Sequence, residues 1–400
     1  MNFPRILKKR KGYIDRIKPF MQKSVVKVLT GQRRVGKSFL LYQLIEEILA
    51  KEPDANIIYV NLEDFTFSSL QTAEDLHSYI ISHSKEKAKN YIFIDEIQDI
   101  PGFEKVIRSL LLNEDNDIYI TGSNAKMLSG ELATYLSGRY IEFKIYSLSY
   151  SEFLEFHGLT ESETSYELYS RYGGLPYLLN LPLEDETVNE YLKSVYSTIV
   201  FRDVVSRYKL RNTLFLEKLI QFLSENIGNL FSAKNISDYL KSQHTTISVN
   251  QIQSYTEYLN NAFLIHRVER YDLIGKRVFE IGEKYYFENM GIRNIVIGYR
   301  ITDKAKILEN LVYNHLLYKG YDIKVGYYGD KEIDFIGEKN GEKLYIQVAL
   351  KIDGDTAERE FGNLLKIQDN YPKIVLTEDT FSGNSYEGIR HCPIRQFLME

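Results

Sequence analysis

The sequence has one cysteine, no tryptophan and no long apolar run, and each shortage excludes a class of protein. Because Cys392 stands alone among 400 residues, intramolecular disulfides and thiolate zinc clusters are excluded, which fits a reducing compartment. No stretch approaches the roughly 18 uninterrupted apolar residues of a membrane span, and the basic N-terminal segment lacks the apolar region of a secretory signal. We therefore expect a cytoplasmic protein with no membrane partner.

The remaining composition is that of an ordinary globular protein. Hydrophobic residues make up 44% and charged residues 26%, which excludes wholesale disorder and fibrous structure. The 32 tyrosines beside the missing tryptophan indicate compositional drift rather than an aromatic stacking surface. At about 150 residues per domain, a chain of this length predicts two to three domains.

Charge is nearly balanced over the whole chain but not along it. Fifty basic and 55 acidic residues give a formal net charge of −5, too even for a polyelectrolyte binder. Residues 1–30, however, hold nine Lys or Arg against a single acid, Asp15. Such a segment either contacts phosphates or forms a solvated helix face before the first strand.

The first half of the chain alternates short apolar segments with amphipathic ones, which is typical of a parallel sheet covered by helices. Residues 38–49 have apolar side chains at helical spacing. From about 151 to 210 the pattern is helical, with an interruption at Gly173-Gly174-Leu175-Pro176. The predicted strands are 25–30, 57–62, 91–94, 118–121 and 140–145.

The second half shows two further patterns. Three short helical segments and two extended stretches have the outline of a winged helix-turn-helix; they are 213–226, 232–241, 248–261, 263–271 and 277–287. After Gly291 the order is helix, three strands, helix and strand, at 304–318, 321–328, 332–337, 343–350, 356–368 and 373–377. Asn340-Gly341 favours a hairpin turn within this last region.

The segment that follows the first predicted strand matches the phosphate-loop pattern G-x-x-x-x-G-K-[ST]. Its glycines allow successive backbone N–H groups to point at phosphate oxygens, and the next helix adds its positive N-terminal end. Lys37 is expected to contact the β- and γ-phosphates and Ser38 to coordinate Mg²⁺. The predicted nucleotide-binding residues are Gly31, Gln32, Arg33, Arg34, Val35, Gly36, Lys37, Ser38 and Phe39.

Two acids stand at the end of the apolar strand 91–94, at the edge of the sheet where ligands bind in open α/β folds. Asp95 is expected to hold Mg²⁺, and Glu96 to polarise the water that attacks the γ-phosphate. One predicted strand falls between the phosphate loop and this acid pair, and another follows the pair. This order is consistent with an extra strand inserted between the two motif strands.

Three more residues are candidate catalytic groups. The strand 118–121 ends in Gly122-Ser123-Asn124, and the spacing does not decide whether Ser123 or Asn124 reaches the γ-phosphate or the attacking water. Arg139 is either a charge-stabilising finger, in the same subunit or the next, or an ordinary ion-pairing arginine. A finger that serves the next subunit would make the protein a homo-oligomer.

Taken together, these motifs resemble the bacterial and archaeal ATPases of the AAA+ type that carry a winged-helix and PD-(D/E)xK nuclease-like C-terminal region. The resemblance covers nearly the whole chain and includes GQRRVGKS, IFIDEIQ, ITGSN, LSGRY, YGGLP, FRDVVSRYKLRN and EIDF…YIQV. It implies that Gly174 and Pro176 lie in a lid motif near the adenine, although a tight turn between helices fits the same letters. One departure is Asn289, where this resemblance leads us to expect Asp, so a carboxylate role there is in doubt.

Residues 304–377 resemble the core of the PD-(D/E)xK nucleases, with Glu309, Asp334 and Gln347 at the positions of its acids. Gln347 stands where the second acid belongs and Ala349 where the lysine belongs. Lys351 could replace that lysine if the strand continues, because alternate residues share a face. We expect a degenerate module without nuclease activity.

The helix expected to read DNA offers Asn250, Gln251 and Gln253 but no Lys or Arg, and it carries Glu257. The following wing is richer in positive charge, with Arg267, Arg270, Lys276 and Arg277. This pattern argues against sequence-specific reading and allows phosphate contact through the wing. It leaves open whether the C-terminal half meets DNA or a protein partner.

The sequence thus predicts an α/β fold: a P-loop NTPase parallel sheet with a helical lid, followed by a winged-helix domain and a small α/β nuclease-like domain. The expected boundaries are 1–150, 151–211, 212–290 and 291–400. The predicted activity is hydrolysis of ATP, with Mg²⁺, that switches how the C-terminal modules meet their partner. The alternatives are a nucleotide-gated switch that does not hydrolyse ATP and an ATP-regulated nuclease.

Overall fold

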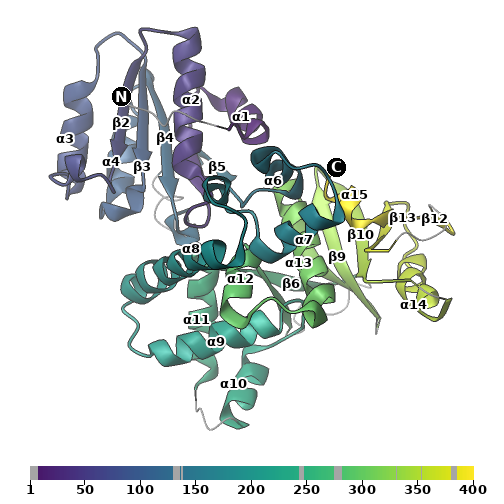
Figure 1. Ribbon diagram of the computed structural model, residues 1–400. Coiled ribbons are helices and arrows are strands. Elements are labelled where there is room, and N and C mark those ends of the chain that lie inside the picture. The colour runs from purple at the N-terminus through teal and green to yellow at the C-terminus, as the bar shows by residue number, and fades with distance from the viewer. Residues whose placement is uncertain are drawn as a thin grey trace. The chain divides into compact units, whose positions relative to one another are not determined.

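The computed structural model describes residues 8–128, 136, 138–242, 247–273, 282–329, 331–352, 354–379 and 385–400. The chain divides into two compact units, drawn in Figure 1. The first unit contains Met1–Ile145 and Asn261–Phe263, and the second contains Tyr146–Asn260 and Leu264–Glu400. No helix among the described residues is long and apolar enough to cross a membrane.

The first unit is built on a parallel sheet. Within the described residues it has five strands in the order β2-β3-β4-β1-β5, and every neighbouring pair is parallel. Because β4 lies between β1 and β3, the extra strand predicted between the two motif strands is confirmed. The five predicted strands are also confirmed, as β1 (Val26–Thr30), β2 (Asn56–Asn61), β3 (Asn90–Asp95), β4 (Asn116–Gly122) and β5 (Tyr140–Lys144).

Successive side chains along a strand point to opposite faces of the sheet, and both faces of this sheet are apolar. One face carries Val28, Ile92 and Ile120, which join a buried core with side chains of α3 and α4. On the other face the rings of Phe93 and Tyr119 stack, with centroids 4.5 Å apart. Helices therefore cover both faces (Figure 1); they are α1 (Lys11–Ile17), α2 (Lys37–Lys51), α3 (Ala73–His83) and α4 (Phe103–Leu110), with short turns η1 (Lys18–Phe20), η2 (Phe65–Phe67), η3 (Ile97–Asp99) and η4 (Ala125–Leu128).

The second unit begins with helices, as the pattern from residue 151 onward predicts. The three short helices predicted before the wing are also present, as α9 to α11. Helix α12 was not predicted; it begins after Asn289, whose side chain accepts the backbone N–H of Ile292. The helices are α6 (Tyr150–His157), α7 (Glu163–Tyr172), η5 (Pro176–Asn180), α8 (Asp185–Thr198), the π-helix η6 (Ile199–Ser206), α9 (Thr213–Glu225), α10 (Ala233–Ser242), α11 (Val249–Asn261) and α12 (Met290–Ile297).

A second sheet runs through the rest of this unit, in the order β12-β13-β11-β10-β9-β8-β6-β7 over the described residues. The wing strands β6 and β7 pair antiparallel, and β6 pairs parallel with β8, so strands from both sides of residue 290 form one sheet. The Asn340-Gly341 hairpin is confirmed, with φ of 53° and 85°. The strands are β6 (Ile265–Asp272), β7 (Glu283–Phe287), β8 (Asp322–Tyr328), β9 (Lys331–Lys339), β10 (Glu342–Ala349), β11 (Lys373–Thr377), β12 (Ser385–Tyr386) and β13 (Ile389–Pro393).

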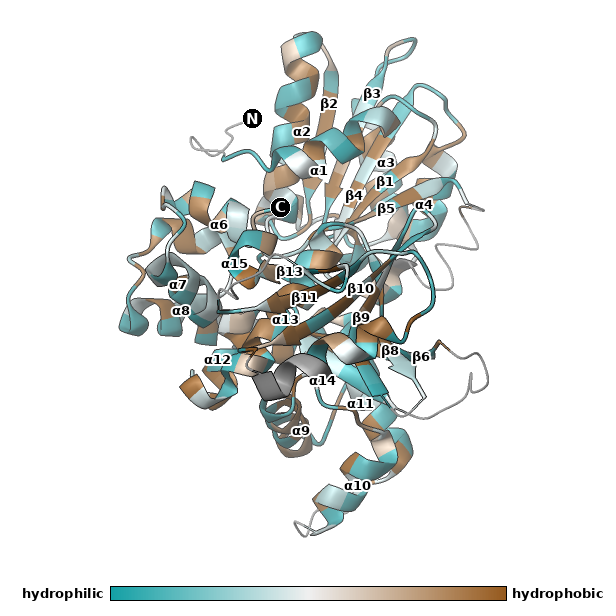
Figure 2. Ribbon diagram, turned by 90° about the vertical axis from the view of Figure 1, so that its right-hand side faces the viewer, coloured by the Kyte–Doolittle hydropathy of each residue, from teal (hydrophilic) through white to brown (hydrophobic). Residues whose placement is uncertain are grey.

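Helices pack on this second sheet through aromatic and aliphatic side chains. The Tyr313 ring of α13 stacks on Tyr286 of β7, with centroids 4.4 Å apart. Phe361 of α14 joins a buried cluster with Tyr345 and Val375. Figure 2 shows the hydrophobic colouring of the middle strands. The remaining helices are η7 (Ile301–Asp303), α13 (Lys304–Tyr318), α14 (Gly354–Leu365) and α15 (Ile394–Phe397).

Candidate nucleotide-binding site

The loop from Gly31 to Gly36 joins β1 to α2 and requires glycine at both ends. Gly31 has φ of +151°, and a Cβ built there would lie 2.1 Å from the carbonyl oxygen of Ile145. Gly36 has φ of +95° and caps the N-terminus of α2. The loop therefore approaches its neighbours by backbone alone and presents the start of α2 beside the carboxyl end of β1, which is the geometry of an anion site.

Lys37, the first residue of α2, is buried and lies over this loop. Its Nζ donates to the carbonyl oxygens of Gly31 and Gln32, each at 3.1 Å. The same Nζ lies 3.8 Å from Oε1 of Glu96. The ammonium is thus held by two carbonyls and one carboxylate at the mouth of the loop.

Asp95 ends β3 and is almost completely buried. The Thr121 hydroxyl donates to its Oδ1, and the Tyr59 hydroxyl lies 3.3 Å from its Oδ2. Burial raises the pKa of Asp95 above its ordinary value, although hydrogen bonds from Ser38 and Thr121 act against that shift. The structure therefore brings the Ser38 hydroxyl and the Asp95 carboxyl together, and these hard oxygen donors fit Mg²⁺.

Glu96 follows directly and has the left-handed backbone conformation, with φ of 56°. Its N–H donates to Oγ1 of Thr121 at 3.0 Å, which fixes that conformation. Burial acts to raise the pKa of Glu96, but the positive charges of Lys37 and Arg33 outweigh it and the pKa lies below its ordinary value. A strained backbone around an ionised, buried carboxylate is typical of a functional position.

The residues at the end of β4 divide into different roles. The Ser123 side chain is among the groups that act to lower the pKa of Glu96, so Ser123 lies near the acid pair, although its buried hydroxyl makes no hydrogen bond within the described residues. Oδ1 of Asn124 instead accepts the backbone N–H of Lys126 at 2.7 Å and holds the turn η4. The sequence analysis did not identify Thr121, whose hydroxyl contacts both acids. A hydroxyl residue at the end of the strand next to β3 is the sequence feature that could have identified it.

The other predicted loop residues have separate partners within the first unit. Nε2 of Gln32 donates to the carbonyl of Phe263 at 2.8 Å, and Arg33 lies 2.9 Å from Glu63. Arg34 and Phe39 are exposed. These side-chain contacts position the loop. Its backbone N–H groups remain the predicted phosphate ligands.

The basic N-terminal segment packs against the first unit at several points. Arg10 is buried, and its guanidinium donates to the carbonyl of Val35 in the loop at 3.2 Å. Lys9 and Lys18 form ion pairs with Glu47 on α2, at 3.3 and 3.0 Å. The positive charges of Lys9 and Lys18 are therefore used in ion pairs, and that of Arg10 supports the loop.

Arg139 is not brought to this site within one chain. Val26 at the start of β1 pairs with Tyr140, the residue after Arg139, whereas the phosphate loop follows Thr30 at the other end of β1. At about 3.3 Å per residue, the two ends of β1 are roughly 13 Å apart. The parallel register therefore separates the backbone of Arg139 from Lys37.

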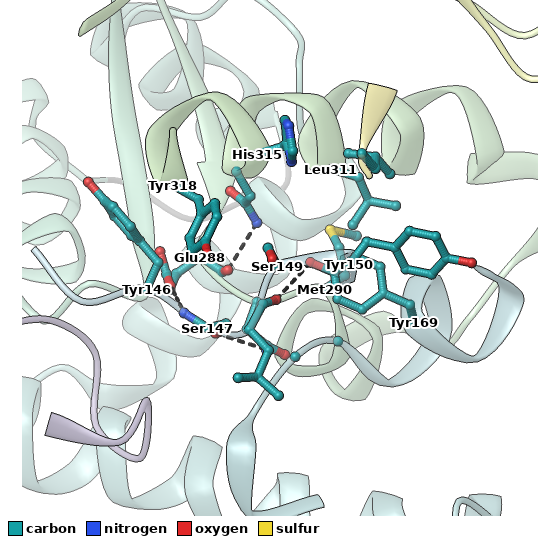
Figure 3. Close-up of a pocket in the computed structure, with 16 residues that line it drawn as sticks. Tyr146, Ser147, Ser149, Tyr150, Tyr169, Glu288, Met290, Leu311, His315 and Tyr318 are labelled. Carbon is teal, nitrogen blue, oxygen red and sulfur yellow. Dashed lines mark hydrogen bonds between the residues drawn. The ribbon is translucent and has the colours of Figure 1, made fainter. Parts of the chain in front are cut away.

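Gly174 and Pro176 belong to the second unit, where close packing explains the glycines. A Cβ on Gly173 would lie 2.3 Å from Oδ1 of Asn289, and a Cβ on Gly174 would lie 2.3 Å from the carbonyl of Leu148. The adjoining cavity in Figure 3 measures about 20 Å³, room for roughly one water. It is far smaller than ligand pockets of roughly 300–1,000 Å³, so this cavity does not hold an adenine ring.

His315 projects toward this cavity from α13, as Figure 3 shows. Burial lowers the pKa of His315 to about 3, so its imidazole is neutral at physiological pH. Nearby, the N–H of Ser147 donates to Glu288 at 2.8 Å. Oδ1 of Asn314 and Nδ1 of His315, from two residues that line the cavity, are buried without a hydrogen-bond partner among the described residues, so the cavity suits one water rather than an adenine ring.

The residues predicted for the C-terminal region separate into two groups. Glu309 and Asp334 converge on Lys284 of β7, while Gln347 is buried on β10. The condition under which Lys351 could replace the lysine, that the strand continues, is not met, because β10 ends at Ala349. Among the described residues, no group of three or more Asp, Glu, His or Cys side chains is arranged to hold a metal ion.

In the predicted winged-helix segment, the four polar residues of α11 named in the sequence analysis are exposed, and the described arginines of the predicted wing have neighbours within the chain. Arg267 lies 3.7 Å from Glu283, and the guanidinium of Arg270 lies 3.2 Å from the ring centre of Tyr327. Lys276 and Arg277 lie outside the described residues. The exposed polar residues of α11 are Asn250, Gln251, Gln253 and Glu257.

A phosphate loop after β1, an acid pair after β3 and an inserted β4 define the first unit as a P-loop NTPase of the AAA type. In agreement, residues 23–154 match the family described as an AAA domain, and residues 163–303 match a domain of unknown function (DUF8612). The chain is 38% identical to an uncharacterized protein of Haemophilus influenzae, with 98% of each chain covered. It is 31% identical to the uncharacterized protein MJ1544 of Methanocaldococcus jannaschii, with 84% of this chain and 77% of that protein covered.

The chain therefore belongs to the same AAA-domain family as these two proteins. Among solved structures, the Aeropyrum pernix ORC1 protein in complex with DNA is matched over 73% of this chain and 93% of that chain. The sequence identity is 14% and the TM-score 0.34, a level at which the likeness carries no inference about function.

Proposed function

We propose that this protein binds ATP with Mg²⁺ at the loop Gly31–Lys37 and hydrolyses it. The observation that carries the proposal is the meeting of Lys37, Ser38, Asp95 and Glu96 at the carboxyl edge of one parallel sheet. A lysine at a helix N-terminus, a hydroxyl beside a carboxyl and an ionised glutamate form a set that positions and neutralises a triphosphate. The match to an AAA domain supports the same activity.

Each residue has a defined task in this proposal. Lys37 exchanges the carbonyls of Gly31 and Gln32 for the β- and γ-phosphate oxygens. Ser38 and Asp95 hold Mg²⁺, which neutralises phosphate charge when bound. Glu96 orients the attacking water and accepts its proton, a task for which a carboxylate of lowered pKa is in the correct protonation state.

Two variants test the proposal. Lys37→Ala should lose binding of a fluorescent ATP analogue, because the main positive charge of the site is gone. Glu96→Gln should retain binding and lower turnover by roughly 10²–10⁴-fold, the range for loss of a general base. Exposed residues provide matched controls, Lys51→Ala on α2 and Glu74→Gln on α3, and both should behave as the unaltered protein.

Other outcomes would redirect the proposal. ATP turnover in Glu96→Gln equal to that of the unaltered chain would remove Glu96 from the catalytic role. Binding without turnover, with or without DNA, would favour a nucleotide-gated switch. Failure of the unaltered chain to bind ATP at all would refute the site.

We further propose that hydrolysis switches how the C-terminal half meets a partner, and that this half comprises the lid, winged-helix and nuclease-like parts expected from the sequence. Helices α9 to α11 followed by β6 and β7 support the winged-helix part. The internal neighbours of Arg267 and Arg270 favour a protein partner over DNA, since phosphate contact would compete with these interactions. Stimulation of phosphate release by duplex DNA would favour DNA instead.

A further inference from the structure

Three carboxylates of the second unit surround the ammonium of one buried lysine. Lys284 lies on β7 and is 2% exposed. Its Nζ is 2.9 Å from Oε1 of Glu309, 2.7 Å from Oε1 of Glu332 and 3.9 Å from Oδ1 of Asp334. These carboxylates come from α13 and β9, so the lysine joins a wing strand to the predicted nuclease-like core.

The second oxygens of two of these carboxylates are bound elsewhere. Oδ2 of Asp334 accepts the backbone N–H of Val348 at 2.8 Å. Oε2 of Glu332 accepts the hydroxyl of Tyr327 at 3.2 Å. Each of these carboxylates therefore keeps one oxygen toward Lys284 and uses the other for the sheet.

The carboxylate of Glu309 is also held by a second donor. Its Oε1 also accepts the hydroxyl of Tyr286 at 2.6 Å. On the other side, a Cβ added to Gly228 would lie 2.9 Å from Oε2 of Glu309, so glycine at this position leaves room for the carboxylate.

The charges of the cluster depend on the lysine. A lysine ammonium has three N–H donors, and its Nζ lies within hydrogen-bond distance of Glu309 and Glu332 and within ion-pair distance of Asp334. Burial acts to lower the pKa of Lys284, but the charges of Glu309, Asp334 and Glu332 outweigh it and the pKa lies above its ordinary value. The lysine is therefore charged and supplies a cation to these carboxylates, while burial and the charge of Glu309 raise the pKa of Asp334 well above its ordinary value.

We propose that the ammonium of Lys284 is the resident cation of this cluster and takes the place that a divalent metal ion would need for nuclease chemistry. The predicted acids Glu309 and Asp334 then serve an internal ion-pair network. A metal-dependent site needs free carboxylate oxygens and a lysine that activates water. Here one oxygen of each carboxylate is paired with the lysine Nζ, so this cluster of described residues holds no catalytic metal ion.

Binding of Mn²⁺ to the nucleotide-free protein, followed by electron paramagnetic resonance, tests this inference independently of ATP hydrolysis. Glu332→Gln is the mild variant, because the Glu332 side chain is 33% exposed. We expect the unaltered chain and Glu332→Gln to bind Mn²⁺ equally. Mn²⁺ bound by the unaltered chain and lost in Glu332→Gln would overturn the inference, as would Mn²⁺-dependent plasmid cleavage lost in that variant.

Removal of the lysine gives the complementary result. Lys284→Met should gain one Mn²⁺ site, and adding Glu332→Gln should weaken that site by roughly tenfold or more, because one ligand is gone. Lys284→Arg keeps a cation and should gain none. A folded Lys284→Met that gains no Mn²⁺ would overturn the inference. If Lys284→Met does not fold, the comparison of the unaltered chain with Glu332→Gln decides alone.

Discussion

Asp95 and Glu96 are consecutive residues whose carboxyl groups meet different surroundings. The carboxyl of Asp95 is buried beside hydroxyl groups, and burial raises its pKa. The carboxyl of Glu96 lies near Lys37 and Arg33, whose charges bring its pKa below the ordinary value. Neighbouring acids with opposite shifts usually have separate roles, and here these would be a cation ligand and a base.

Thr121 is the residue that holds the acid pair in place, so its hydroxyl should matter for turnover more than for binding. We expect Thr121→Val to lower kcat by roughly 10–100-fold, the usual effect of losing a supporting hydrogen bond around a metal or catalytic site. The affinity for the fluorescent ATP analogue should stay nearly constant, because Lys37 and the loop are unchanged.

Thr121→Ser is the matched control and should restore most of the turnover, since it retains the hydroxyl. Equal turnover in Thr121→Val and the unaltered protein would show that Thr121 has only a packing role. A parallel loss of affinity in the valine variant would indicate a disturbed loop instead.

At the scale of elements, α12 shows why an asparagine occupies position 289. Oδ1 of Asn289 accepts the N–H of Ile292 and caps the helix, while Nδ2 donates to Oγ of Ser147 at 3.1 Å. An aspartate would provide the same cap but would have no N–H for Ser147. The structure thus gives this position a structural function in which no carboxylate is required.

We expect Asn289→Ala to destabilise α12 by about 2 kcal/mol, because it loses a helix cap and a buried hydrogen bond. Asn289→Ser should cost about half as much, since serine also caps helices but is too short to replace the amide. Hydrogen–deuterium exchange of residues 290–297 measures both effects. Asn229→Ala, in an exposed turn, is the control and should leave this exchange unchanged; equal protection in all variants would contradict the assigned role.

The pairing of β6 with β8 is the second feature at this scale that determines which residues meet. It places the wing strands in the same sheet as the C-terminal strands and brings Lys284 to Glu309 and Asp334. The winged-helix and nuclease-like parts expected as neighbours along the chain therefore share a sheet and an ion-pair network.

At the scale of the whole molecule, the position of Arg139 decides whether this residue can act as an arginine finger within one chain. Since the β1–β5 register places this residue at the far end of β1 from the loop, Arg139 could act as an arginine finger only at the site of a second copy of the chain. We expect Arg139→Ala to leave ATP turnover unchanged wherever light scattering gives the mass of a single chain.

The mass should be measured with and without a non-hydrolysable ATP analogue. If the analogue produces an assembly, Arg139→Ala should lose turnover there, and mixing it with Glu96→Gln should restore part of that turnover. A loss of turnover in single chains would contradict the separation of Arg139 from the site in one chain.

The sequence by itself determined the strands of the first unit and the motifs that lie within them or directly after them. Apolar runs of four to six residues predicted the five strands of the first unit, and glycines at fixed spacing predicted the loop around Lys37. The inserted β4 also followed from strand order. These features were accessible because strand periodicity, turn chemistry and the phosphate loop are local properties of neighbouring residues.

Only the tertiary structure decided which distant residues meet. The contact of Thr121 with the acid pair, the separation of Arg139 from Lys37 and the convergence of Glu309 and Asp334 on Lys284 depend on strand register and sheet order. A shift of register changes these neighbours without changing any local pattern. The strands were therefore predictable, whereas the chemistry between them required the fold.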